Sequence, residues 1–167
     1  MPITFNGDGT ITGNTNIIGH LSVSAQPCLM LDDIVTENMS SNDNDDPIRF
    51  TNTTINVGAI SVNAAKSRIT VGIAGTYLVS VNISGEKSGS GDNNDNIITK
   101  LMVNGGTPNA NAYPHNTFGS DDDEEFSFTF VRPIVLAAND YLEVALSAIS
   151  GSSAQIQEGY FSVTRLH

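Results

Sequence analysis

The residues that most often carry catalysis are few in this chain of 167 residues, which has three histidines and one cysteine. His115 is in the polar stretch Tyr113-Pro-His-Asn116, His20 and His167 are distant from it in sequence, and Cys28 is inside an apolar stretch. A hydrolase needs a nucleophile, a base and an orienting group, and such a triad is recognised by geometry and not by proximity in sequence. We find no catalytic constellation here and expect a protein that is not an enzyme.

Acidic clusters are the second group of residues with chemical potential. They are Asp43-Asn-Asp-Asp46, Asp92-Asn-Asn-Asp95 and Asp121-Asp-Asp-Glu-Glu125. Their carboxylates are hard oxygen ligands of the kind that Ca²⁺ takes, but none of the clusters has the EF-hand spacing. Acidic runs are commonly solvated loops whose charges repel one another, so we expect no cofactor, with calcium as the alternative. The candidate calcium ligands are Asp92, Asp95, Asp121, Asp122 and Asp123.

The charge balance and the hydropathy pattern exclude several kinds of partner. With 7 Lys and Arg against 18 Asp and Glu, the net charge of −11 would repel nucleic-acid phosphates. The single cysteine cannot form an intrachain disulfide framework. The chain shows neither a basic start followed by an apolar region nor a run of about 18 apolar residues. We therefore expect no nucleic acid and no membrane as partners, and synthesis as a soluble protein in the cytoplasm.

Alternation of apolar and polar residues predicts the strands that must position any site. Only 15% of the residues are charged, which leaves little material for helix surfaces. A period of two marks a strand with one buried face. The alternating apolar residues are Tyr77, Val79, Val81 and Ile83; Phe126, Phe128 and Phe130; Leu142, Val144 and Leu146; Phe161 and Val163. The three phenylalanines could form a stacking platform for sugars or bases, but they fall on one face, so we interpret them as core.

Further short strands are predicted between clusters of Asn, Asp and Gly. They are Leu21–Ala25, Cys28–Leu31, Pro47–Phe50, Ile55–Val57, Ile69–Ile73 and Ile97–Val103. About ten short strands without a helix indicate an all-β fold, an antiparallel sandwich of two sheets over residues 20–167. Asn104-Gly105 suits a primed turn because both residues can take positive φ. Three long polar loops, Glu37–Asp46, Gly85–Asn96 and Gly105–Glu125, are the surface most available to partners.

Residues 1–19 form a distinct segment. Phe5-Asn-Gly-Asp-Gly9 is a strong turn signal between two short β-like stretches, Ile-Thr-Phe and Thr-Ile-Thr. Such a segment cannot bury its own apolar side chains, so we expect a docking arm; a disordered terminus is the alternative. The apolar residues of the arm are Ile3, Phe5, Ile11, Ile17 and Ile18.

The order of features in the second segment is similar to that of a known family. A short strand around Ile48 and Phe50 precedes Ile55 and Val57, then Ile69, Val71 and Ile73, and then Gly75-Thr-Tyr77, which opens an alternating strand. Downstream come Leu101-Met-Val-Asn-Gly105, Asn139-Asp140 before Tyr141-Leu-Glu-Val144, and Tyr160-Phe-Ser-Val163. This order resembles the globular domain of complement subcomponent one-q and its tumour-necrosis-factor-like relatives.

The resemblance implies a jelly roll of ten strands that assembles as a homotrimer. The family usually has Gly where this chain has Asn139, which is the next best residue for a left-handed position. We expect Gly75 to supply a backbone conformation closed to residues with a Cβ, and Tyr77 to bury its ring while its hydroxyl reaches a partner. The positions that carry the family signature are Phe50, Gly75, Tyr77, Val79, Phe128, Asp140, Leu142 and Phe161.

The opening residues 3–13 also look like the start of many bacteriophage structural proteins. We therefore expect a structural virion protein, a trimeric capsid decoration or cement protein on the outer capsid surface. Its arm would dock on the major capsid protein, and its trimer would suit a three-fold site of an icosahedral shell. The alternative is the head of a tail fibre that recognises host surface glycan through the Gly85–Asn96 and Gly105–Glu125 loops.

Overall fold

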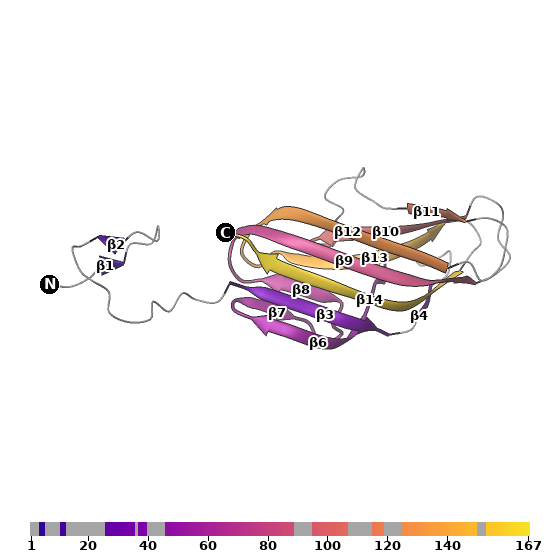
Figure 1. Cartoon of the computed structure of the whole chain (residues 1–167), viewed down its shortest axis with the longest axis horizontal. Helices are drawn as coiled ribbons and strands as arrows, with labels where there is room; N and C mark the ends of the chain where they lie inside the picture. Colours follow the sequence, from indigo (N-terminus) through magenta and orange to yellow (C-terminus); the bar gives the residue numbers. More distant parts are fainter. Residues whose placement is uncertain are drawn as a thin grey trace.

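The structure is a computed structural model that describes residues 4–5, 11–12, 26–35, 37–39, 46–88, 95–106, 115–118, 125–149 and 153–167. Every regular element in these ranges is a β-strand, and the ranges hold no helix that could span a membrane. Two six-stranded sheets face each other as the layers of a sandwich (Figure 1). The all-β, two-sheet prediction is therefore confirmed.

All strand pairs are antiparallel. The first sheet, here the β9 sheet, has the order β12 (Glu125–Leu136), β9 (Gly75–Ser88), β14 (Ser153–Arg165), β3 (Cys28–Ile34) and β6 (Phe50–Val57), with β4 (Glu37–Met39) also paired to β14. The second, here the β13 sheet, has the order β11 (His115–Phe118), β10 (Asp95–Val103), β13 (Tyr141–Ile149), β8 (Arg68–Val71) and β7 (Ile60–Val62), with β5 (Asp46–Pro47) also paired to β13. From β8 to β14 the chain passes repeatedly between the two sheets, as in a jelly roll.

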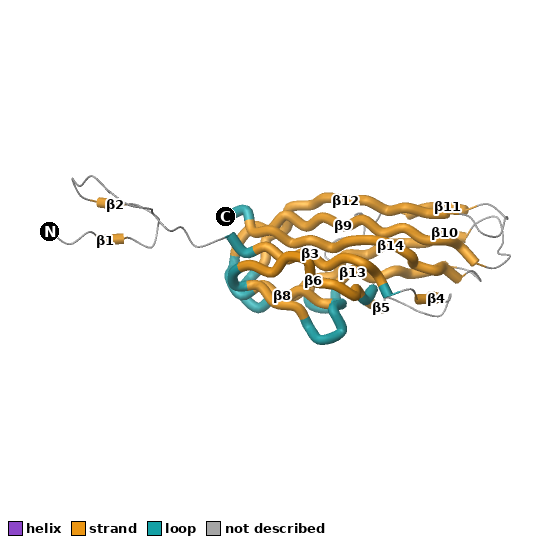
Figure 2. The backbone as a smooth tube through the Cα atoms, turned by 60° about the horizontal axis from the view of Figure 1, so that its bottom comes forward, coloured by secondary structure: helices purple, strands orange, loops and turns teal. Residues whose placement is uncertain are grey.

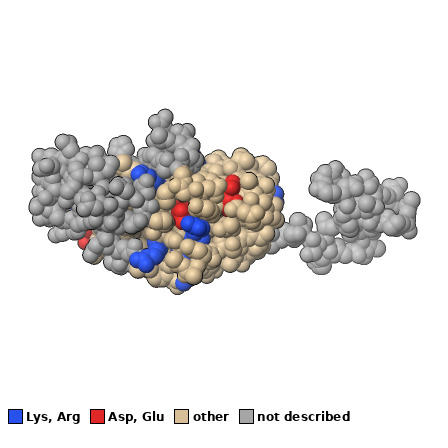
Figure 3. Space-filling view, turned by 180° about the vertical axis from the view of Figure 1, so that it is seen from behind, with Lys and Arg blue, Asp and Glu red and all other residues tan. Residues whose placement is uncertain are grey.

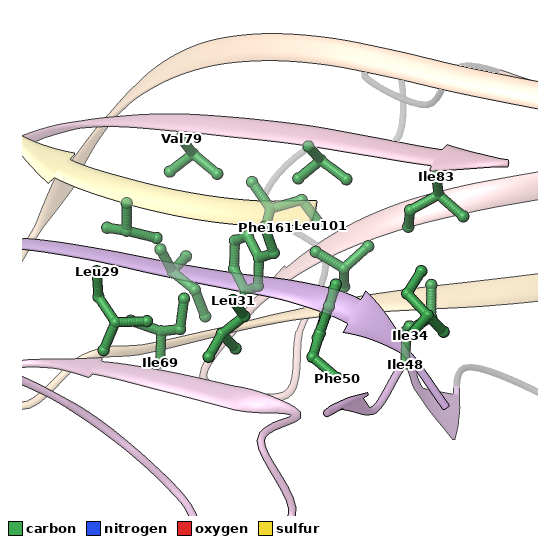
Figure 4. Close-up of a cluster of buried hydrophobic side chains, with 14 of the residues drawn as sticks. Leu29, Leu31, Ile34, Ile48, Phe50, Ile69, Val79, Ile83, Leu101 and Phe161 are labelled. Atoms are coloured by element: carbon green, nitrogen blue, oxygen red, sulfur yellow. The ribbon is translucent and has the colours of Figure 1, made fainter. Parts of the chain in front are cut away.

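The alternating residues fill the space between the sheets. In β9, Tyr77, Val79, Val81 and Ile83 are all fully buried, while the residues between them lie on the outer face. Figure 4 shows side chains from β3, β9 and β14 pointing toward those of β8 and β10. Burial of a large apolar side chain contributes about 1.5–3 kcal/mol, so this layer is the main source of stability.

The sheets reach further than the apolar pattern predicted. β9 continues to Ser88 and β10 begins at Asp95, so both ends of the predicted Gly85–Asn96 loop, half of its residues, are strand. The predicted Gly105–Glu125 loop contains β11, and the predicted Glu37–Asp46 loop contains β4 and the start of β5. These strands were missed because their residues are largely polar and give no amphipathic signal.

Other strand boundaries also differ from the prediction. Ile48 and Arg49 separate β5 from β6, and the strand predicted to reach Ile73 ends at Val71. β7 was not predicted because it is only three residues long. The predicted strand Leu21–Ala25 lies outside the described residues.

Two short strands lie in the predicted arm. β1 (Thr4–Phe5) and β2 (Ile11–Thr12) pair in an antiparallel ladder in which Phe5 is opposite Ile11. The two predicted β-like stretches therefore pair with each other, while the residues of the predicted turn between them lie outside the described residues. Ile3, Ile17 and Ile18 lie outside the described residues.

Candidate functional site

The aromatic and aliphatic signature residues lie in the core. Phe50, Tyr77, Val79, Phe128, Leu142 and Phe161 each expose at most 2% of their surface. The rings of Phe50 and Phe161 pack at a tilt, with centroids 6.2 Å apart. These residues hold the two sheets together and face away from solvent. They can support a functional site, but they cannot contact a ligand or partner themselves.

Gly75 and Tyr77 join the start of β9 to the end of the chain. A Cβ on Gly75 would lie 2.3 Å from the carbonyl oxygen of His167, and the backbone NH of Thr76 donates to that same oxygen at 3.1 Å. The C-terminal residues therefore lie against the start of β9. Figure 2 shows the C-terminus at one end of the sandwich. The φ angle of Gly75 is outside the left-handed region, so the expected conformational role is wrong and close packing is the reason for the glycine.

The buried ring of Tyr77 has a polar partner for its hydroxyl. The hydroxyl donates to the carbonyl oxygen of Ile73 at 2.6 Å. Burial raises the pKa of the Tyr77 hydroxyl, while the nearby Arg165 guanidinium lowers it by a smaller amount. The hydroxyl therefore stays protonated and ties β9 to the turn that precedes it.

Asp140 organises two turns at one end of the sandwich. Its carboxylate accepts from the Asn104 side-chain amide at 2.8 Å and from the Ala137 backbone NH at 2.7 Å. These two hydrogen bonds, that of Asn104 foremost, lower the pKa of Asp140. Asn104, Gly105 and Asn139 have φ angles of 53°, 75° and 72°, which confirms the predicted primed turn and left-handed position. Asp140 is thus a structural residue of the turns.

Toward one end, the outer face of the β9 sheet carries apolar side chains on either side of the polar residues Ser162 and Thr164 of the central strand β14. Leu78 of β9 lies opposite Pro133 of β12, and Met30 of β3 lies opposite Ile55 of β6. Val131 exposes 60% of its surface, Val135 exposes 80%, and Ile55 and Val57 expose 39% each. We call the outward-facing residues Cys28, Met30, Ile55, Val57, Leu78, Val131, Pro133 and Val135 the apolar face. Exposed apolar side chains gathered on one surface are typical of contact sites.

The opposite end of the same outer face is polar and hollowed. A cavity of about 400 Å³ opens among β9, β12 and β14, and its lining residues are Ser84, Gly85, Glu125, Phe126, Ser127, Gln157 and Glu158. A β-bulge shapes it, because the register between β14 and β9 shifts between Ile156 and Glu158 and leaves Gln157 as the extra residue. We call this cavity the bulge pocket.

Neither a triad nor a calcium site is assembled among the described side chains. The Cys28 sulfur lies 3.2 Å from the Thr164 hydroxyl, and the His167 ring lies 3.0 Å from the Thr76 hydroxyl. In the part of the chain with described side chains, no three residues among His, Cys, Asp and Glu come together. His20, Asp92, Asp121, Asp122 and Asp123 lie outside the described residues, and the side chains of Asp95 and His115 are not described.

The outer face of the β13 sheet carries paired charges. The Arg68 Nε donates to Glu143 Oε1 at 2.9 Å, and the Arg68 guanidinium lies 4.0 Å from the centroid of the Tyr141 ring. Figure 3 shows that charged side chains are few where described residues form the surface, and that both signs occur there. These contacts tie β8 to β13 and offer no surface of a single charge to a partner.

Sequence reasoning missed both the apolar face and the bulge pocket. The apolar residues of the face come from four strands whose order in the sheet was not predicted, and the pocket depends on a bulge. The alternation of Ser80, Asn82, Ser84 and Glu86 between buried residues was the available signal for a polar outer face. It could not show which other strands lie beside β9.

The fold of this chain is similar to two kinds of solved structure. No protein-family model and no curated protein matches the sequence. The chain is similar to the tumour necrosis factor Eiger from S. frugiperda, with a TM-score of 0.61 and 15% identity over 85% of this chain and 93% of that one. It is equally similar to the globular domain of the zebrafish complement 1qA protein, with a TM-score of 0.61 and 10% identity over 85% of this chain and 98% of that one. The domain therefore has the jelly-roll fold that tumour-necrosis-factor and complement one-q domains share.

Proposed function

We propose that this protein is a non-enzymatic structural protein that works as a homotrimer on the outer capsid surface of a bacteriophage particle. The single observation that best supports a homotrimer is the apolar face of the β9 sheet. Val131 and Val135 lie on an edge strand of that sheet, and Ile55 and Val57 lie on the opposite edge. Both edges therefore offer apolar side chains to a neighbouring copy.

The energetics favour burial of this face. A fully exposed valine or isoleucine that becomes fully buried in an interface contributes about 1.5–3 kcal/mol, and these side chains, which expose 39–80% of their surface, contribute a corresponding fraction. Cys28 and Leu78, which flank Thr164 of the central strand β14, are half-buried already and complete the contact. In a cyclic trimer, each subunit presents one part of its surface to one neighbour and another part to the other, so both edges are used.

The location on a capsid rests on the opening segment. Residues 3–13 look like the start of phage structural proteins, and part of that segment is the ladder between β1 and β2. A trimer matches the symmetry of a three-fold capsid site, where the arm would reach the major capsid protein. The mechanism is mechanical, since apolar surface buried across neighbouring subunits opposes outward pressure from the packaged DNA.

The copy number of the protein per purified virion tests this location. Quantitative mass spectrometry against the major capsid protein should give a ratio of the same order as the capsid protein itself. Removal of residues 1–19 should abolish capsid binding and leave the domain folded. A handful of copies per particle would contradict the capsid location and indicate a tail appendage, and unchanged capsid affinity would exclude a role for the arm.

A further inference from the structure

We propose that the bulge pocket binds one neutral, hydroxyl-rich sugar residue. This inference goes beyond the proposed structural role and does not depend on the capsid location. The cavity volume of about 400 Å³ lies in the range of small-molecule sites, which is about 300–1,000 Å³. All seven lining residues belong to β9, β12 and β14, so the pocket is built on the sheet itself and not on a long loop.

The polar groups of the pocket are fixed by strand pairing. Ser84 lies opposite Ser127 on one side and opposite Glu158 on the other, so the three residues form one row across three neighbouring strands. Adjacent strands are about 4.8 Å apart, which makes the row about 10 Å wide, enough for one sugar ring. Glu125, two residues before Ser127 on the same strand and face, adds a second carboxylate.

The bulge supplies the remaining polar group and closes the pocket floor. Gln157 is the residue that the bulge leaves without a partner in the ladder, so its amide is available at the pocket. Beneath it the packing is tight, because a Cβ on Gly85 would lie 2.2 Å from the Gln155 carbonyl oxygen and 2.8 Å from Phe126 Cζ. The pocket therefore has a rigid floor and a polar rim.

The chemistry of the lining selects the class of ligand. Two carboxylates without any Lys or Arg in the lining disfavour an anionic ligand such as a phosphate or an acidic sugar. The serine hydroxyls and the glutamine amide both donate and accept hydrogen bonds, as sugar hydroxyls do. The carboxylates accept from sugar hydroxyls in charge-assisted bonds. A simple cation would use only the carboxylates, so the mixed lining favours a neutral sugar.

The pocket is separate from the apolar face on the same sheet. Ser84 of the pocket follows Leu78 of the apolar face by six positions along β9, and Val131 of the apolar face follows Ser127 of the pocket by four positions along β12. At a rise of about 3.3 Å per residue, these pairs are about 20 Å and about 13 Å apart along their strands. The sugar site is therefore at the other end of this outer face from the proposed trimer interface.

The test is saturation-transfer difference NMR on the full chain with methyl glycosides of glucose, galactose, mannose and N-acetylglucosamine at millimolar concentration. Glucuronic acid and spermidine serve as anionic and cationic probes. We expect saturable binding of at least one neutral glycoside, with an affinity that added NaCl does not change. Absence of saturable binding by every neutral glycoside would overturn the proposal.

Conservative substitutions locate the binding. The double variant Glu158→Gln, Ser127→Ala should weaken the glycoside affinity about tenfold. Ser127→Ala removes one hydrogen bond, and Glu158→Gln weakens a charge-assisted one. Ser162→Ala removes a hydroxyl from the same face of β14 outside the lining and should leave the affinity unchanged. Equal glycoside affinities of the double variant and of Ser162→Ala would overturn the assignment to this pocket. Salt-sensitive binding of spermidine, lost in Glu158→Gln and without glycoside binding, would show a cation site instead.

Discussion

At the scale of single residues, Asp140 shows how one carboxylate sets the geometry of two turns. The Asp140 carboxylate accepts a hydrogen bond from the side-chain amide of Asn104. The side-chain oxygen of Asn104 in turn accepts a hydrogen bond from the Tyr141 backbone NH at 3.0 Å. Asn104 itself is in the left-handed region, where Asn is tolerated better than most residues. The signature at Asp140 is thus explained by hydrogen bonding within the turns.

The lowered pKa of Asp140 predicts a pH dependence of stability. Because the carboxyl titrates lower in the folded chain than in the unfolded one, the charged form stabilises the fold above the unfolded pKa of about 3.9. This contribution is lost as the pH falls through the folded pKa. Asp140→Asn should therefore lower the Tm at pH 7, and the difference from the wild type should shrink as the pH falls below about 4.

A charge control separates this effect from general electrostatics. The net charge of −11 means that removing any carboxylate relieves some repulsion. Glu125→Gln removes one charge from the exposed pocket rim and should not lower the Tm at pH 7. Thermal melts of the three proteins across pH 3–7 make the comparison, and a Tm difference for Asp140→Asn that does not vary with pH would contradict the assignment.

At the scale of elements, the bulge in β14 is held in place by a glycine. A Cβ on Gly159 would lie 2.4 Å from the Asn82 carbonyl oxygen and 2.7 Å from Ile34 Cδ1. The first of these atoms belongs to the backbone of β9, which cannot move without breaking the β9–β14 ladder. The close approach of the two strands after the bulge therefore requires a residue without a side chain.

Gly159→Ala should destabilise the protein by about 1–3 kcal/mol, as forced overpacking of a core does. Gly106→Ala is the matched control, since the nearest atom to its Cβ would be the Val103 carbonyl oxygen at 3.7 Å, an ordinary contact. Urea unfolding followed by circular dichroism gives both free energies of unfolding. Equal stabilities for the two variants would mean that the strands can separate slightly at no cost.

At the scale of the whole molecule, the apolar face makes the oligomeric state testable. Val131→Asp places a charge in the proposed interface, at a position that is 60% exposed in the single chain, so the fold should survive. Light scattering coupled to size-exclusion chromatography should show a trimer for the wild type and a monomer for this variant. Ser61→Asp, on the exposed side of β7 in the other sheet, should remain trimeric. A monomeric wild type would refute the homotrimer.

The sequence by itself determined the local features of this protein. Alternation in stretches such as Tyr77–Ile83 identified which side chains are buried, because the strand period of two is a property of the local backbone. Asn104, Gly105 and Asn139 identified left-handed turn positions, because tolerance of positive φ belongs to the residue itself. These signals were enough to predict a two-sheet sandwich.

Only the tertiary structure decided which strands are neighbours, and with them the surfaces. Pairing of β14 with β3 joins residues more than a hundred positions apart, and its pairing with β9 joins residues at least 65 positions apart. Nothing in a local pattern specifies that choice. The bulge at Gln157 and the polar ends of β9 and β12 carry no apolar signal, yet their register creates the pocket. Outer faces are assembled from several strands at once, so their chemistry appears only after the sheet order is fixed.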